Sequence, residues 1–250
     1  MCTLTWRVTP DSYQILFNRD EQRSRSIAVP PSEFIQSGRT ALMPIDPDGQ
    51  GSWIACNDSG LSLCLLNYYQ GIKPVSVTQS RGQLVRQLAY CQSEKEVLIR
   101  LINLDWDRFP PFTLVIFDDA KLKKTEKVLS IIWDGIKVKH VIQSSPLTSS
   151  SYEFESVKAA RQTHYNTLNT DKPSLLKLMA YQLSHIPQRS AHSVCMHRED
   201  AHTVSLTIIN VERDLVSMDY HQGSPCLAKA ITTVSCSKKQ VVTHDRRKSA

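Results

Sequence analysis

Pairs of short apolar strands joined by turn residues recur along this chain, and helical blocks interrupt them. The first pair spans Cys2 to Val8 and Tyr13 to Asp20, with the turn cluster Thr9-Pro10-Asp11-Ser12 between them. A second pair follows at Trp53 to Asn57 and Leu61 to Tyr68. Turns of this length join antiparallel neighbours, so the sequence predicts antiparallel sheets.

Between the strand blocks, the apolar residues recur at helical spacing. Residues 79–104 predict one broken helix or two consecutive helices, because Leu84, Val85 and Leu88 fall on one face. Ser151 to Tyr165 and Ser174 to His185 are also expected to be helical. Further strands are expected at residues 112–117, at 128–141 folded about Asp134-Gly135, and at 194–196, 203–211 and 215–220.

This order of strands, helices, strands, helices and strands restricts the fold. Hairpins give antiparallel sheets, and the outer sheet faces need helices to cover them. The sequence therefore predicts an α+β fold, a four-layer α/β/β/α sandwich of two stacked, mainly antiparallel sheets. We expect one domain over residues 1–236 and a basic, flexible tail over residues 237–250.

Charge and cysteine content exclude several classes of protein. The net charge of +6 is concentrated near the end, at Lys238-Lys239 and Arg246-Arg247-Lys248, so it does not indicate nucleic-acid binding. The seven cysteines are scattered and odd in number, which does not suggest a disulfide framework. No apolar run has the length of a membrane span, and the first residues lack the layout of a secretory signal. We expect a cytoplasmic protein without an integral membrane segment.

One group of residues resembles a metal site. His192, Cys195, His197 and His202 lie close together in the sequence. On a strand, however, residues three apart point to opposite faces, so His192 and Cys195 do not converge. Cys195 and His197 share a face, but two ligands without a second pair make a poor zinc site. We therefore expect neither a metal nor a cofactor.

The first hairpin gives Cys2 a specific neighbour. If the hairpin closes symmetrically, Val8 pairs with Tyr13 and Cys2 pairs with Arg19, with both side chains on one face. The Arg19 guanidinium would favour the thiolate of Cys2. After removal of Met1, the free α-amine of Cys2 could act as base for its own thiol.

Asp20 lies beside the chain start in this register and could hold that amine. A register slip of one residue would place Cys2 and Arg19 on opposite faces, and Cys2 would then be an ordinary second residue.

The segment Asn18-Arg19-Asp20-Glu21, at this interval after Met1-Cys2, resembles the motif of the NRDE family, which includes the transport-and-Golgi-organisation proteins. Other segments also resemble blocks of that family. These are Gly51-Ser52-Trp53-Ile54, Gly60-Leu61, Leu66-Asn67-Tyr68, Thr148-Ser149-Ser150-Ser151-Tyr152 and Ser193-Val194-Cys195-Met196-His197-Arg198. The resemblance covers about residues 1–220.

The family is similar to N-terminal-nucleophile (Ntn) hydrolases of the cysteine branch, which includes choloylglycine hydrolases and penicillin V acylases. The resemblance implies Cys2 as nucleophile, with Arg19 and Asp20 as active-site residues. Asn67 could supply an oxyanion-hole donor, or it could merely end a strand and cap a turn.

Four more residues are expected to contact the substrate: Asn18, Trp53, Ser149 and Ser150. The acylases carry an Asn after a Thr near the nucleophile, where this chain has Ser149 after Thr148. A serine hydroxyl there donates a hydrogen bond over a shorter reach, so either the site is rearranged or the loop contacts substrate. An exposed serine-rich linker is the remaining interpretation.

Two functions follow from these observations. The first is hydrolysis of an amide or related acyl bond of an unknown small molecule by Cys2, after removal of Met1. The alternative is a non-catalytic carrier or trafficking factor for a hydrophobic ligand such as haem or lipid.

Overall fold

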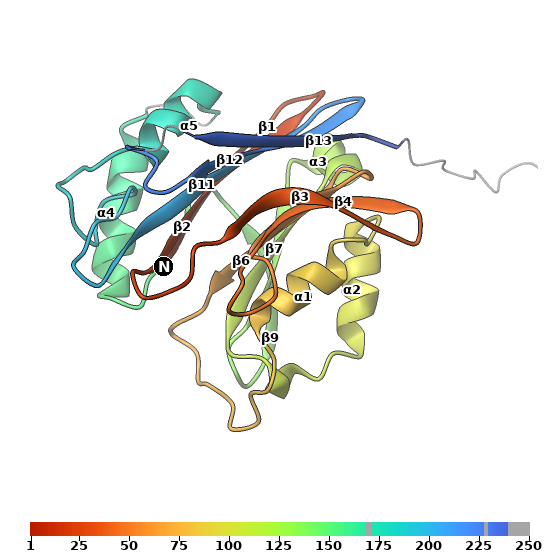
Figure 1. Ribbon diagram of the computed structural model, residues 1–250, viewed down its shortest axis with the longest axis horizontal. Coiled ribbons are helices and arrows are strands. Elements are labelled where there is room, and N and C mark those ends of the chain that lie inside the picture. The colour runs from red at the N-terminus through yellow and green to blue at the C-terminus, as the bar shows by residue number, and fades with distance from the viewer. Residues whose placement is uncertain (169–171, 228–229, 240–250) are drawn as a thin grey trace, which may run out of the picture.

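The computed structural model describes residues 1–168, 172–227 and 230–239. It contains two stacked antiparallel sheets with helices on both outer faces (Figure 1). The first sheet has the order β10-β1-β2-β11-β12-β13, and the second has the order β3-β4-β5-β6-β7-β8-β9.

The bounds of the elements are as follows. The first sheet comprises β1 (Cys2–Val8), β2 (Tyr13–Gln22), β10 (Leu147–Ser149), β11 (Ala201–Val211), β12 (Leu215–Gln222) and β13 (Ile231–Ser237). The second comprises β3 (Val29–Gln36), β4 (Arg39–Ile45), β5 (Ile54–Asn57), β6 (Leu61–Asn67), β7 (Phe112–Asp118), β8 (Val128–Trp133) and β9 (Val138–Gln143). The helices are α1 (Arg81–Leu88), α2 (Glu94–Ile102), α3 (Asp119–Thr125), α4 (Phe154–Asn166) and α5 (Leu175–Gln182), with a short 3-10 turn at Trp106–Arg108.

The layers follow from the two-residue period of the strands. In β2, Ile15 and Phe17 enter the core between the sheets, whereas Leu16 faces outward and packs against Leu178 of α5. On the opposite side, α1 and α2 cover the second sheet with residues such as Leu84. Figure 1 shows α4 and α5 on one side of the molecule and α1 and α2 on the other. The predicted four-layer sandwich is confirmed.

The first hairpin has the predicted register. Val8 pairs with Tyr13, and Cys2 pairs with Arg19. The hairpins at residues 54–67 and 128–143 and the two helices within residues 79–104 are also confirmed.

Several elements differ from the sequence prediction. The strands β3, β4, β10 and β13 and the helix α3 were not expected, and residues 194–196 do not form a strand. β3 lies at a sheet edge and contains Pro30 and Pro31, which lack backbone donors and hide the strand pattern. α3 begins after Asp118, whose side chain accepts from the Lys121 N–H.

The beginning of the expected tail also differs. Lys238 forms an ion pair with Asp119, and Lys239 forms one with Asp58 at 2.6 Å. Lys238 is thus buried against the body of the domain, whereas the side chain of Lys239 stays half exposed while it is paired with Asp58. Residues 240–250 of the expected tail lie outside the described residues. Among the helices of the described residues, none has the length and apolar character needed to cross a membrane.

Candidate active site

A cavity of 460 Å³ opens beside Cys2. Its lining includes Cys2, Arg19, Asp20, Trp53 and Asn67, which are five of the residues that the sequence singled out. They come from β1, β2, β6 and the segment before β5, so the hairpin register and the stacking of the sheets together bring them into one cavity. A larger depression of 650 Å³ lies elsewhere, beside Arg7 and Tyr165, and no cysteine is among its described lining residues.

The Arg19 side chain is buried between acidic and aromatic groups. Its guanidinium lies 4.4 Å from the centre of the Trp53 ring, and its Nη2 lies 3.2 Å from Glu21 and 3.6 Å from Asp46. A guanidinium over an indole face is held by a cation–π attraction. Within the described part of the chain, the Trp53 Nε1 is buried and has no hydrogen-bond partner.

The thiol of Cys2 is protonated in this arrangement. Burial raises the pKa of Cys2, and this effect outweighs the opposing charges of the Met1 ammonium and, more weakly, of Arg19. The expectation that Arg19 favours the thiolate is therefore right in sign but too small to decide the outcome while Met1 is present.

Met1 lies directly beside Cys2 at the start of the chain. Its ammonium donates to the Asp20 carbonyl at 3.2 Å and to the Tyr69 hydroxyl at 3.4 Å, and its own carbonyl accepts from the Asp20 N–H at 2.9 Å. Its side chain packs in a small apolar cluster with residues that include Val157 and Met196. A second cavity of 210 Å³ is lined by Met1, Asp20 and Tyr69, which also line the main cavity. Met1 thus lies between the two cavities.

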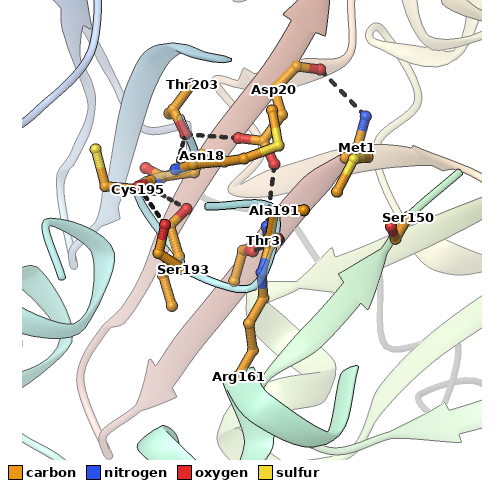
Figure 2. Close-up of polar contacts among 12 residues, drawn as sticks. Met1, Thr3, Asn18, Asp20, Ser150, Arg161, Ala191, Ser193, Cys195 and Thr203 are labelled. Atoms are coloured by element: carbon orange, nitrogen blue, oxygen red, sulfur yellow. Dashed lines mark hydrogen bonds and ion pairs between the residues drawn. The ribbon is translucent and has the colours of Figure 1, made fainter. Parts of the chain in front are cut away.

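The Asp20 carboxylate is used differently from the expectation. It lies on the face of β2 opposite to Cys2, where Oδ1 accepts from Thr203 at 2.7 Å and Oδ2 lies 3.5 Å from Arg161 (Figure 2). The backbone of Asp20, rather than its carboxylate, contacts the chain start. The ammonium that it contacts is that of Met1, so the expected contact with the Cys2 amine stays a prediction for the chain without Met1.

Arg161 of α4 was not singled out by the sequence. It is completely buried and donates to the Thr3 hydroxyl at 2.6 Å and to the Ala191 carbonyl at 3.1 Å, besides its ion pair with Asp20 (Figure 2). It therefore ties the helix layer to both strands of the first hairpin. The sequence did not predict its burial, because most charged residues on helices are exposed.

Asn67, Tyr69 and Arg81 lie on another part of the cavity lining. Asn67 donates one of its two amide hydrogens to the Tyr69 hydroxyl at 2.8 Å. Burial raises the pKa of Tyr69, which keeps its phenol protonated, and lowers that of Arg81, although its guanidinium stays charged. Arg81, at the start of α1, has no carboxylate partner among the described residues, although it donates to the Pro111 carbonyl.

Three expected substrate contacts lie outside this cavity. Asn18 is on the other face of β2, where its buried amide donates to the carbonyls of Gln182 and Val194. Ser149 is the cross-strand partner of Cys2 in β10, and Ser150 donates to the Tyr152 carbonyl within a turn. Strand alternation places Asn18 on the face of β2 opposite to Cys2, and the serine segment is engaged in local pairing.

Solved structures with this arrangement of layers are enzymes with an N-terminal nucleophile fold. A mutant conjugated bile acid hydrolase from Clostridium perfringens is 14% identical, with a TM-score of 0.56 over 96% of this chain and 97% of that chain. The N-acylethanolamine-hydrolyzing acid amidase orthologue of Caenorhabditis elegans is 13% identical, with a TM-score of 0.56 over 91% and 94%. At these identities, the likeness establishes the Ntn-hydrolase-like fold.

Sequence comparison narrows the relationship further. No curated protein matches the chain significantly. The model of one family, Transport and Golgi organisation 2, matches residues 1–221, which include the first hairpin and every residue of the cavity described above. The chain therefore belongs to the Transport and Golgi organisation 2 (TANGO2) family.

Proposed function

We propose that the protein is an N-terminal-nucleophile cysteine hydrolase that cleaves an amide or related acyl bond of a small molecule after Met1 has been removed. The observation that carries this proposal is the position of the Cys2 thiol, which lies in a cavity with Arg19 and with the start of the chain. Removal of Met1 would make the amine of Cys2 the new chain start. It would also join the 210 Å³ cavity to the 460 Å³ cavity.

In the proposed reaction, the α-amine of Cys2 accepts the thiol proton, and the thiolate attacks the carbonyl carbon of the substrate. The carbonyl oxygen gains negative charge, which the protonated Tyr69 hydroxyl and the Arg19 guanidinium stabilise. The leaving amine takes the proton from the α-ammonium and departs. Water then hydrolyses the thioester, which releases the acid and regenerates the thiol.

Tyr69 is better placed as an oxyanion donor than Asn67. The Tyr69 oxygen accepts from both Asn67 and the chain-start ammonium, so its own O–H proton is free to donate. Asn67 then acts through Tyr69, by holding the phenol in place. This assignment replaces the direct donor role that the sequence suggested for Asn67.

The charges of the cavity favour a hydrolase over a carrier for a hydrophobic ligand. The lining contains three arginines, Arg19, Arg25 and Arg81, together with the acidic residues Glu21 and Asp46, while the Asp20 carboxylate points to the other face of β2. A haem or lipid pocket is expected to be lined mostly by apolar side chains. Arg19 and Arg25 have carboxylate partners, whereas Arg81 has none among the described residues. We infer a substrate that carries an anionic group near Arg81.

The proposal is tested by the mass and thiol reactivity of the mature chain. We expect the intact mass to lack Met1, and Cys2 in that form to react with iodoacetamide at neutral pH at least about 10-fold faster than Cys236. A chain that retains Met1 should react slowly at Cys2, because burial raises the thiol pKa, and its rate should rise with pH as thiolate forms. Retention of Met1 in the active preparation would contradict the mechanism.

The anionic preference can be measured without knowing the substrate. Iodoacetate carries a negative charge and iodoacetamide does not. The rate of Cys2 alkylation by iodoacetate, divided by the rate with iodoacetamide, therefore measures how strongly the cavity attracts an anion. We expect Arg81→Gln to lower this ratio by about tenfold, which corresponds to about 1.4 kcal/mol for one charge pair in a partly buried site. Arg100→Gln, on the exposed face of α2, is the matched control and should leave the ratio unchanged. An unchanged ratio in Arg81→Gln would remove the argument for an anionic substrate.

A further inference from the structure

Two histidines and two cysteines converge outside the cavity. His185 follows α5, Cys195 and His197 lie in the segment before β11, and Cys226 lies between β12 and β13. Their four ligand atoms all lie within 4.8 Å of one another. Three segments therefore bring four ligand atoms to a common point. The segments of His185 and of Cys195 and His197 are close in the sequence, and that of Cys226 is distant.

The separations are those of ligands around a tetrahedral metal ion. The two Nε2 atoms are 3.2 Å apart, and the His197 Nε2 lies 3.6 Å from the Cys195 sulfur and 3.4 Å from the Cys226 sulfur. Zinc binds nitrogen at about 2.0–2.1 Å and sulfur at about 2.3 Å, so tetrahedral angles separate two nitrogens by about 3.3 Å and a nitrogen from a sulfur by about 3.5 Å.

Hydrogen bonding alone does not explain this arrangement. The Nε2 of His197 approaches three different groups, His185, Cys195 and Cys226. A ring nitrogen carries either one proton or one lone pair in the ring plane, so it makes one good hydrogen bond and not three. A metal ion at the centre accounts for all three separations at once, since each ligand then points at the ion.

We propose that His185, Cys195, His197 and Cys226 form a structural zinc site. Two neutral imidazoles and two thiolates complete a closed four-coordinate shell, as in structural Cys₂His₂ sites. Binding releases the two thiol protons, and the charges of the two thiolates balance that of Zn²⁺.

The sequence did not suggest this set, because Cys226 comes from a distant segment and His185 lies on the other side of His192 from Cys195. His192 and His202, which lie nearer in sequence, take other positions. His192 contacts the Ser156 hydroxyl at 3.0 Å, and His202 is the bridge partner of His197 rather than a ligand. The pair Cys195 and His197, set aside for want of partners, acquires them through His185 and Cys226.

Two hydrogen bonds connect the proposed zinc site to Asp20 of the candidate active site. Met196, between two of the proposed ligands, donates its N–H to the Thr203 hydroxyl at 2.7 Å, and that hydroxyl donates to Asp20 at 2.7 Å. Figure 2 shows the Cys195 sulfur directed away from Asp20, on the other side of Thr203. Zinc would therefore act by fixing the segment that supports Asp20, without entering the cavity.

The experiment measures metal content and ligand field. The purified full chain, loaded with zinc and passed through a desalting column, should retain about one zinc ion per chain. Cobalt(II) in place of zinc should give the intense visible bands of tetrahedral cobalt and a sulfur-to-cobalt charge-transfer band. Cys226→Ser and His185→Ala should weaken zinc binding by at least about 100-fold, more than the roughly 10–100-fold cost of losing an outer-shell partner.

Matched controls separate this site from adventitious binding. Cys236→Ser and His192→Ala remove the same side-chain types outside the cluster, and they should keep both the zinc and the cobalt spectrum. Melting temperature with and without a chelator provides a readout independent of the ligand field, and only chains with all four ligands should show a decrease. Retention of no zinc by the folded chain, or equal loss of zinc in control and ligand variants, would overturn the proposal. A Cys195–Cys226 disulfide that forms in zinc-loaded protein would also overturn it.

Discussion

Replacing Cys2 by alanine is expected to remove turnover of any amide or acyl substrate, by roughly 10⁴-fold or more, while the chain stays folded. The reason is that the thiol forms the covalent bond to the substrate, and no other described lining residue of the 460 Å³ cavity is a cysteine. Cys2 is partly buried beside the core between the sheets, so the loss of one sulfur should have a small effect on stability. Turnover is measured on a panel of N-acyl amides, with melting temperature as a check on folding.

The same experiment can separate the nucleophile from its base. A chain that keeps one extra residue before Cys2 retains the thiol but converts the α-amine into an amide, which is no base. We expect this form to fold, because the Met1 form already places a residue there, and to lose turnover almost as completely as Cys2→Ala. Cys236→Ala is the matched control and should keep full turnover. Undiminished activity of the extended form would rule out the α-amine as base, even if Cys2→Ala is inactive.

The neighbours of Cys2 that the sequence predicts correctly are those fixed by local geometry. A four-residue turn after Val8 sets the register, and the register alone pairs Cys2 with Arg19. Trp53 and Asn67 line the same cavity because Trp53 directly precedes β5 and Asn67 ends β6, so both lie at the same end of this strand pair. These relations need only strand alternation and sheet stacking.

The parts that were missed depend on packing between distant layers. Arg161 contacts Asp20, which is 141 positions away in the sequence. The sequence around a helical arginine does not indicate which strand its side chain will contact. Arg81 enters the cavity because α1 starts next to Gly51, where the backbones are so close that a Cβ on Gly51 would lie 2.2 Å from the Gly82 carbonyl carbon. The convergence of His185 and Cys226 on Cys195 and His197 likewise depends on the conformations of the connecting segments, which the sequence pattern does not reveal.

The serine segment is a different case, because the resemblance suggested a substrate contact at Ser149 and Ser150, whereas neither residue lines the cavity beside Cys2. Ser149 is a β10 residue paired with Cys2, and in the described structure its buried hydroxyl has no hydrogen-bond partner. Its proximity to the nucleophile is real, but it lies beside the strand and not in the cavity. A short strand at a sheet edge has too few residues to leave a pattern in the sequence.

The second large effect concerns stability and involves Arg161. Arg161→Met is expected to lower the free energy of unfolding by about 3–5 kcal/mol, because it leaves the fully buried Asp20 carboxylate with Thr203 as its remaining side-chain partner. Methionine keeps most of the volume of the arginine stem, so the loss reflects the unpaired charge rather than a cavity. Urea unfolding at neutral pH measures the change. Arg100→Met, which breaks an exposed ion pair with Glu96 on α2, is the matched control and should cost less than about 0.5 kcal/mol.

The double variant Arg161→Met/Asp20→Asn decides whether the buried pair is the cause. With the carboxylate replaced by a neutral amide, the uncompensated charge disappears, and we expect the double variant to be more stable than Arg161→Met alone. If the two changes were simply additive, the loss in Arg161→Met would instead come from its hydrogen bonds to Thr3 and Ala191. Because Asp20 holds the chain start through its backbone, this coupling also measures how firmly the helix layer positions the first hairpin, and with it Cys2.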